Sequence, residues 1–286
     1  LSIIIVTYGA ILYSDNTKTT FPLITYALLP AAVLGLMGLI DDIRGLPALP
    51  RLIAQTVVAI LVALFLLNRD LQVFSFGSQL ANDVIVVVWI VAICNSINFF
   101  DNLDGGAAGT VAVTSIALFV LAFQGQQFLI AALSAVTAGA TIGFLLWNKS
   151  PARIYMGDAG ALFLGVLIAT LTIRLQPDTE VMWTSLATPA LLLAVPILDT
   201  CVAVLSRLKR GISPLQGGHD HLSHRLVRGG LSRRTAAFSL WGLSAFFALC
   251  AVAIPRTSEG LEQIIVAIAA LVWAVLFIKF FQSKDA

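Results

Sequence analysis

One short acidic segment, from Asn95 to Gly106, has the residue types and spacing of a reactive site. Within it, Asn98, Asp101 and Asp104 are spaced by three, so a helix would place them along one polar stripe. The segment follows a long apolar run, and acidic side chains at such a place are costly and usually functional. The alternative interpretation is a helix end with a polar cap and a glycine stop.

Two further acidic motifs lie at the ends of apolar runs. Asp41 and Asp42 close one run, where acids oppose the helix dipole, so capping does not explain them. Pairing with Arg44 or Arg51 is the alternative explanation. Asp158 opens another run, where it could be a helix cap, but the basic residues just upstream also suit a metal–phosphate site.

All three histidines, His219, His221 and His224, lie in one long polar loop. A zinc site is conceivable, but no cysteine accompanies them, and the acids elsewhere are hard oxygen ligands suited to Mg²⁺. We therefore favour these histidines and Arg225 as donors to a phosphate. A basic segment that contacts anionic lipid is the alternative. Asp199, inside the preceding apolar run, fits either a site wall or a hydrogen bond to a neighbouring helix.

The composition identifies the surroundings of these residues as a membrane. The chain has 286 residues, of which 59% are hydrophobic and 11% charged, whereas about a quarter are charged in soluble domains. The net charge of +2 gives no basic surface for nucleic acid, so no nucleic-acid partner is expected. Three cysteines lie in apolar runs and suggest no disulfide framework.

The apolar runs predict an all-α, polytopic membrane helix bundle, in which each span needs about 20 residues. The first candidate is short and the chain begins at Leu1, so we expect the natural first span to be missing. We count ten transmembrane helices, at about 1–13, 23–40, 52–67, 83–99, 107–123, 128–147, 159–175, 183–206, 235–254 and 261–281.

The basic residues predict how the chain is oriented. With the loops assigned alternately to two sides, thirteen of the 17 Lys and Arg residues fall on one side, which should be cytoplasmic. The acidic motifs and the histidines fall on that same side. We therefore predict a single transferase domain over 1–286, with cytoplasmic active-site loops at about 41–51, 100–106, 148–158 and 207–233.

Carboxylates, an asparagine and His/Arg donors at one membrane face suggest phosphate chemistry with Mg²⁺. The metal would neutralise a diphosphate and align it with an attacking oxygen, while the helices would admit a lipid tail. No Walker-type loop or dinucleotide fingerprint occurs in the sequence. The residues by themselves thus predict a metal-assisted phosphoryl transfer to or from a lipid.

In this order, the motifs resemble those of the polyprenyl-phosphate N-acetylhexosamine-1-phosphate transferases, of the glycosyltransferase family 4 type. The resemblance covers nearly the whole chain and is greatest to bacterial undecaprenyl-phosphate N-acetylglucosamine-1-phosphate transferases. The three consecutive histidines of relatives that transfer phospho-N-acetylmuramoyl-pentapeptide are absent. The matching residues are Asp41-Asp42, Asn95-x-x-Asn98-x-x-Asp101-x-x-Asp104-Gly105, Asn148, Met156-Gly157-Asp158, Pro196-x-x-Asp199-Thr200 and Gly217-Gly218-x-Asp220-His221-x-x-His224-Arg225-Leu226.

This resemblance implies eleven spans in the full-length protein and a defined reaction. A sugar 1-phosphate, with N-acetylglucosamine as the default sugar, would pass from a UDP-N-acetylhexosamine to undecaprenyl phosphate, with release of UMP. The step would begin a cell-envelope glycan in the bacterial cytoplasmic membrane, with the active site facing the cytoplasm. The cofactor would be Mg²⁺, with Mn²⁺ as the alternative, and the resemblance also admits a homodimer.

The resemblance also implies roles for individual residues. Asp158 would be the principal metal ligand, and Asp101 would assist at the metal or contact the nucleotide. Asp41 or Asp42 would orient or deprotonate the lipid phosphate. Direct attack is preferred over a covalent aspartyl intermediate, because a phosphate monoester has a second pKa of about 6 and is already largely ionised. The expected substrate-binding residues are Asn98, Asp104, Asn148, Tyr155 (stacked on uracil), and His221, His224 and Arg225 (on the diphosphate).

Two other interpretations remain open at this point. An inactive, lipid-binding relative would keep the same motifs without turnover. An ion-coupled transporter also carries intramembrane acids, although it should scatter its polar groups through the membrane midplane rather than gather them at one face.

Overall fold

The computed structural model describes residues 1–12, 17–67, 78–176, 182–214 and 218–283, and all regular secondary structure in these segments is helical. Eight of the described helices are long and apolar enough to cross a membrane. The chain is therefore a polytopic helical membrane protein, as the apolar runs predicted. The eight helices are α2 (Thr17–Arg44), α3 (Ala48–Leu67), α4 (Gln79–Phe100), α5 (Gly106–Gln124), α6 (Phe128–Asn148), α7 (Gly157–Arg174), α11 (Arg233–Ala253) and α12 (Glu259–Gln282).

The described helices do not reach the ten spans predicted from the sequence. The first predicted span is α1 (Ser2–Leu12), whose 11 residues are too few to cross a bilayer. The eighth, predicted as one helix, is instead a pair, α8 (Met182–Leu192) and α9 (Ala194–Lys209), bent by 75° at the break. The described part thus contains eight spans, or nine if the bent pair crosses as one.

The break between α8 and α9 follows from Pro196, which the motif Pro196-x-x-Asp199-Thr200 contains. Pro196 lies in the first turn of α9, where it donates no backbone hydrogen bond and its ring excludes the carbonyl of Leu192, four residues earlier. That released carbonyl accepts a hydrogen bond from Thr114 Oγ1 of α5, at 2.9 Å. A neighbouring helix therefore satisfies the polar group that the bend exposes, as a low-dielectric environment requires.

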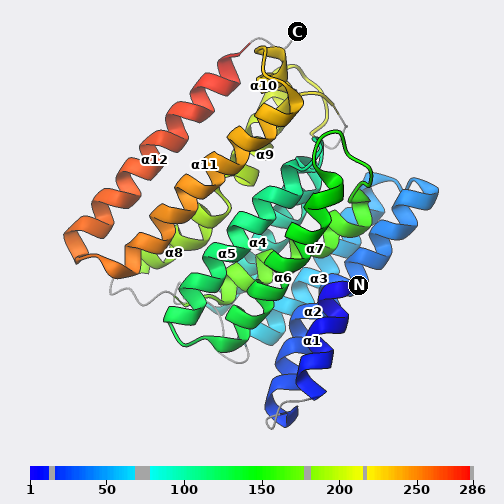
Figure 1. Cartoon of the computed structure of the whole chain (residues 1–286), viewed down its shortest axis with the longest axis vertical. Helices are drawn as coiled ribbons and strands as arrows, with labels where there is room; N and C mark the ends of the chain where they lie inside the picture. The colour runs from blue at the N-terminus through cyan, green and yellow to red at the C-terminus, as the bar shows by residue number, and fades with distance from the viewer. Residues whose placement is uncertain (13–16, 68–77, 177–181, 215–217, 284–286) are drawn as a thin grey trace.

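Helix α7 lies at the centre of the bundle and α12 at its edge. In their most apolar stretches, 72% of α7 residues are buried but only 6% of those in α12. Figure 1 shows α12 along one side of the molecule, next to α11. Helix α7 packs against α2 and α4. A Cβ on Gly38 of α2 would lie 2.4 Å from the Asp158 carbonyl oxygen, so the α2–α7 contact requires glycine there.

Short connections place the acidic motifs at helix ends around α7. Asp41 and Asp42 lie in the last turn of α2, Asp101 directly follows α4, and Asp158 lies in the first turn of α7. The long polar loop carries a short helix, α10 (Leu222–Arg228), which packs against α9 and α11. In Figure 1, α10 lies near the C-terminus, at one end of α11 and α12. A 3₁₀ turn, η1 (Ile254–Arg256), follows α11.

Candidate active site

An arginine joins carboxylates from two of the packed helix ends. Arg51 of α3 donates from its Nη1 atom to Asp41 Oδ2 at 2.6 Å and to Asp158 Oδ2 at 2.9 Å. The other oxygen of Asp41 accepts the backbone N–H of Leu46 at 2.5 Å. Asp41 is buried, whereas Arg51 and Asp158 are partly exposed. The alternative weighed for Asp41, pairing with Arg51, is thus present, and the pair includes Asp158 as well.

Asp42 caps the helix that carries Asp158. Its two carboxylate oxygens accept the backbone N–H groups of Asp158 at 2.9 Å and Ala159 at 3.1 Å, where the helix dipole favours negative charge. Gly157 has φ +65°, and a Cβ there would lie 2.6 Å from Asp42 Oδ2. A glycine is therefore needed for the close approach of Asp42 to α7, and Asp42 fixes the position of Asp158.

The end of α4 supplies an amide and a third acid. Asn98 Nδ2 donates to Asp158 Oδ1 at 2.8 Å. No described residue donates a hydrogen bond to the Asp101 carboxylate. Burial, together with the negative charges of Asp158 and Asp42, raises the pKa of Asp101 to about 6. Asp41, Asp42, Asp101 and Asp158, which we call the acid cluster, thus carry an excess of negative charge that one arginine does not neutralise.

Asn148 and Asp104 hold the backbone of the loops beside the acid cluster. Asn148 is buried; its Oδ1 accepts the Gly105 N–H at 3.0 Å, and its Nδ2 donates to the Ile154 carbonyl at 2.9 Å. Asp104 Oδ2 accepts the Ala152 N–H at 3.1 Å. Both side chains therefore position the two loops that flank the site, and a direct contact of either with a nucleotide stays a prediction.

Tyr155 and His221 are placed differently from each other. Tyr155 is 76% exposed and does not line a described cavity, so its stacking on uracil stays a prediction.

His221 is buried: its Nδ1 lies 2.7 Å from Asp199 Oδ2, and its Nε2 lies 3.2 Å from Arg207 Nη2. A guanidinium only donates, so Nε2 must accept and Nδ1 must carry the proton toward Asp199. The direct contact of His221 with a diphosphate also stays a prediction.

Asp199 and Asp220 anchor the histidine loop to α9. The buried Asp199 also accepts the Leu222 N–H at 2.6 Å. Of the two interpretations given for Asp199, the structure therefore favours the hydrogen bond to a neighbouring element. Asp220 accepts from Arg207 Nε at 2.9 Å and from Arg210. Burial by itself would raise the pKa of Asp220, but these two guanidinium groups outweigh burial and lower the pKa. Its carboxylate therefore stays ionised and holds the loop in place.

Arg225 ties the same loop to the end of α12. Its Nη1 donates to the Phe280 and Ser283 carbonyls, both at 2.8 Å, its Nη2 to Ser206 Oγ at 2.8 Å, and its Nε to the Asp220 carbonyl at 2.9 Å. The side chain is buried. The structure thus uses Arg225 to join α9, α10 and α12, and its contact with a diphosphate stays a prediction.

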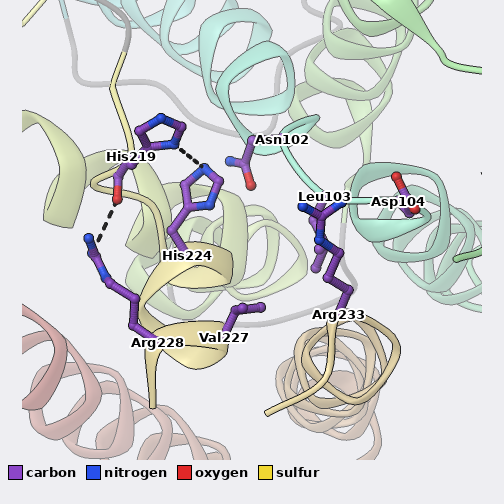
Figure 2. A pocket seen from close by; sticks show the side chains of 8 residues that line it. All are labelled: Asn102, Leu103, Asp104, His219, His224, Val227, Arg228 and Arg233. Atoms are coloured by element: carbon purple, nitrogen blue, oxygen red, sulfur yellow. Dashed lines mark hydrogen bonds between the residues drawn. The ribbon is translucent and has the colours of Figure 1, made fainter. Parts of the chain in front are cut away.

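A cavity of about 350 Å³ lies between the end of α4 and α10. Figure 2 shows His219, His224 and Asn102 on one side of it and Arg233 with Asp104 on the other. The two histidines approach at 3.4 Å between His219 Nδ1 and His224 Nε2. Burial and the nearby positive groups lower the pKa of His224. The cavity is lined by Asn102, Leu103, Asp104, His219, His224, Val227, Arg228 and Arg233.

Sequence reasoning missed several of these residues. Arg207 begins the polar loop for which lipid contact is the alternative interpretation, yet it is buried and hydrogen-bonded to Asp220 and His221. Arg51 was considered only as a local partner of the α2 acids. Arg233 and Asn102 were not singled out, although Asn102 lies in the first acidic segment. For the three arginines, the sequence does contain a usable indication, because an arginine at the end of an apolar helix is either exposed to lipid headgroups or paired inside the protein.

The donor set determines which metal these residues could hold. Among the described residues, no three His, Cys, Asp or Glu side chains converge as a preformed metal site. The acid cluster nevertheless fits a hard divalent cation, because it offers carboxylate oxygens with unneutralised negative charge, and Asp101 has no hydrogen-bond donor among the described residues. Asp158 and Asp101 are the side chains that would hold Mg²⁺.

An apolar cavity extends to the first turn of α7. It has a volume of about 600 Å³ and lies between α1, α2, α6 and α7. Its lining includes Leu36 and Leu39 of α2 and Ala159, Gly160 and Phe163 of α7. Ala159 directly follows Asp158, so an apolar chain can approach the acid cluster along this route.

Comparison with known proteins places the chain among its relatives. The model of the family described as glycosyl transferase family 4 matches residues 24–176, more than half of the chain, including the whole acid cluster. A "probable undecaprenyl-phosphate N-acetylglucosaminyl 1-phosphate transferase" of Bacillus subtilis is 33% identical over 94% of this chain and 75% of its own length.

Two further relatives carry related names. A decaprenyl-phosphate N-acetylglucosaminephosphotransferase of Mycolicibacterium smegmatis is 34% identical over 73% of this chain and 59% of its own length. A phospho-N-acetylmuramoyl-pentapeptide-transferase of Halalkalibacterium halodurans is 31% identical over 76% of this chain and 70% of its own length. Given the family match and the extent of these similarities, the chain belongs to glycosyl transferase family 4.

Proposed function

We propose that this protein transfers N-acetylglucosamine 1-phosphate from its UDP-sugar to a polyprenyl phosphate, undecaprenyl phosphate in particular, and releases UMP. One observation carries the proposal: four carboxylates lie at the ends of three helices, at one end of the bundle, next to a cavity lined by histidines and arginines. The named relatives act on undecaprenyl or decaprenyl phosphate and N-acetylglucosamine, which supports this substrate pair.

The reaction exchanges one phosphorus–oxygen bond for another. An oxygen of the acceptor phosphate forms a bond to the phosphorus that bears the sugar. The bond from that phosphorus to the bridging oxygen breaks, and UMP leaves with the electron pair. The acceptor is largely ionised at neutral pH, so no side chain has to remove a proton before attack.

Asp41 and Asp42 orient the acceptor rather than forming a covalent intermediate. Both oxygens of Asp41 already accept hydrogen bonds, from Leu46 and Arg51, and those of Asp42 cap α7. A carboxylate held in this way is a poor nucleophile toward a diphosphate. Arg51 contributes positive charge at the place where the acceptor phosphate would enter.

A divalent cation completes the site in this proposal. Mg²⁺, or Mn²⁺ as the alternative, would be held by Asp158 and Asp101, and when bound it supplies positive charge that offsets the charge of the diphosphate. Asn98 holds the Asp158 carboxylate in place, and Asp42 fixes the backbone that carries it. These two contacts hold Asp158, the proposed metal ligand, in position before the cation binds.

The cavity beside α10 is the proposed site of the sugar nucleotide. His219, His224, Arg228 and Arg233 line it and offer donors to phosphate oxygens, whereas Asn102 offers an amide to the sugar. Asn102 in its lining directly follows Asp101, so a diphosphate bound there would lie close to Asp101. The positive-inside bias supports a cytoplasmic orientation for this face. A homodimer is part of the expectation and needs no residue of this site.

A UMP-release assay tests the proposal. The protein in detergent is mixed with undecaprenyl phosphate, Mg²⁺ and a panel of UDP-sugars, and UMP is measured. Release is expected with UDP-N-acetylglucosamine and should fall by at least a hundredfold with EDTA or in Asp158→Asn. Asp83→Asn, at the far end of α4, is the matched control and should keep its activity.

Other outcomes point to other functions. Release with another sugar alone would keep the transferase and replace the donor. Absence of release with every sugar, from a protein that unfolds cooperatively, would favour the inactive lipid-binding relative.

A further inference from the structure

A second cavity lies away from the acid cluster, between the cytoplasmic halves of α6 and α11 in the proposed orientation. Its volume is about 190 Å³. Both helices pack against α5, and the cleft lies between them. Its walls are mainly apolar, formed by Ile142, Leu145 and Leu146 of α6 and by Ala237, Phe238 and Trp241 of α11.

Two positively charged side chains lie at the polar end of this cleft. Lys149 directly follows α6, and Arg234 lies in the first turn of α11; both line the cavity and both are exposed. Arg234 Nη2 donates to the Ser150 carbonyl at 3.0 Å, which holds the guanidinium across the cleft. Arg153 lies close by, 5.8 Å above the Trp147 ring. Two positive groups, Lys149 and Arg234, thus line the cleft at the ends of the two helices.

The apolar walls are open to the surrounding lipid. Leu146 is 64% exposed and Phe238 is 57% exposed, and both lie on helices that cross the membrane. An apolar cleft with cations at the headgroup level fits a phospholipid whose headgroup carries negative charge. Inside the bilayer, an acyl chain rather than water would cover these apolar walls.

We propose that this cleft, between α6 and α11, binds an anionic phospholipid. The acceptor substrate is not the occupant, because none of the four carboxylates of the acid cluster lines the cavity, and the reacting phosphate must meet them. Lys149 and Arg234 outnumber the one carboxylate in the lining, Asp104, whose Oδ2 already accepts the Ala152 N–H, so a neutral lipid would leave an excess of positive charge at the cleft. Charge complementarity therefore selects a headgroup such as phosphatidylglycerol.

The bound lipid would also support the nearby active-site loop. Trp241, in the wall of the cleft, donates from Nε1 to the Gly105 carbonyl at 3.0 Å. Asp104 lines both this cleft and the cavity beside α10. A lipid packed against Trp241 thus restrains the turn that separates the two cavities.

The test measures lipid binding directly. The protein in detergent is titrated with phosphatidylglycerol or phosphatidylcholine, and bound lipid is counted by native mass spectrometry. Each cation near an anionic headgroup contributes about 1 kcal/mol, so removing both in Lys149→Gln/Arg234→Gln should weaken phosphatidylglycerol binding roughly 30-fold. Lys149→Gln alone should weaken it about fivefold, and phosphatidylcholine binding should stay unchanged.

A matched control removes two cations elsewhere at the same membrane face. Lys209→Gln/Lys279→Gln lies at the ends of α9 and α12 and should retain native affinity. The proposal is overturned if the control weakens binding as much, if both lipids bind equally, or if affinity does not depend on Lys149 and Arg234. It is equally overturned if only undecaprenyl phosphate binds in a manner that depends on these two residues.

Discussion

Replacing Asp199 by asparagine tests the hydrogen-bond network that holds the histidine loop. Asp199 is completely buried and accepts two hydrogen bonds, from His221 Nδ1 at 2.7 Å and from the Leu222 N–H at 2.6 Å. Asparagine has the same shape but only one acceptor oxygen. Its NH₂ group must therefore face one of these two donors, leaving two donors in contact.

The histidine cannot relieve this conflict by changing its tautomer. With the proton moved to Nε2, His221 would point an N–H at Arg207 Nη2, 3.2 Å away, which also only donates. One donor is left unsatisfied in either case. A buried unsatisfied donor costs about 1–3 kcal/mol, and each hydrogen bond to a charged group contributes about 1.5–3 kcal/mol. We expect Asp199→Asn to lower the free energy of unfolding by about 3 kcal/mol.

Thermal unfolding in detergent checks this expectation. For a chain of 286 residues, a loss of about 3 kcal/mol should lower the Tm by roughly 5 °C. Thr200→Val is the matched control, because the neighbouring Thr200 hydroxyl is buried and makes no hydrogen bond within the described residues. Its Tm should change by less than about 2 °C. An unchanged Tm for Asp199→Asn, or an equal loss in the control, would refute the proposed network.

Three further predictions follow from other contacts. Arg51→Gln removes the cation between two carboxylates, so the variant should be less stable in EDTA and should gain more Tm from Mg²⁺ than the native protein does; an equal gain would contradict this. The raised pKa of Asp101, about 6, disfavours its charged form in the folded state, so the free energy of unfolding in EDTA should fall as pH rises from about 4 to 6. A series of Tm measurements across this pH range should show a smaller fall for Asp101→Asn. An identical fall would show that Asp101 is not the group with the raised pKa. Arg225→Lys cannot make the same set of hydrogen bonds to α9 and α12, so hydrogen exchange at the end of α12 should rise at least tenfold, while Arg44→Gln, at the end of α2, should leave it unchanged.

Much of the fold could be predicted from the sequence, because membrane helices need long apolar runs whatever they pack against. Every predicted span overlaps a described helix, and the acidic motifs do lie at helix ends. The break in the eighth run was the main error in the helix assignment. Hydropathy alone did not show it, because Pro196 and Leu192 interact through backbone sterics rather than apolar character.

The sequence by itself determined which acids could form a site, because Asp41, Asp42, Asp101 and Asp158 occur where apolar runs end and acids are costly. It could not determine their partners. Arg51 joins two carboxylates that are 117 residues apart in the chain, and Asn98 meets Asp158 only because α4 packs on α7.

Only the tertiary structure decided which polar residues face a cavity and which support the backbone. Asn148, His221 and Arg225 had the residue types of substrate contacts, yet the side chain of each forms hydrogen bonds with neighbouring loops or helices. Arg207 had the type of a lipid-facing cation, yet it is buried. The physical reason is that a side chain's chemistry is local to its residue, whereas the direction and burial of its hydrogen bonds depend on elements distant in sequence.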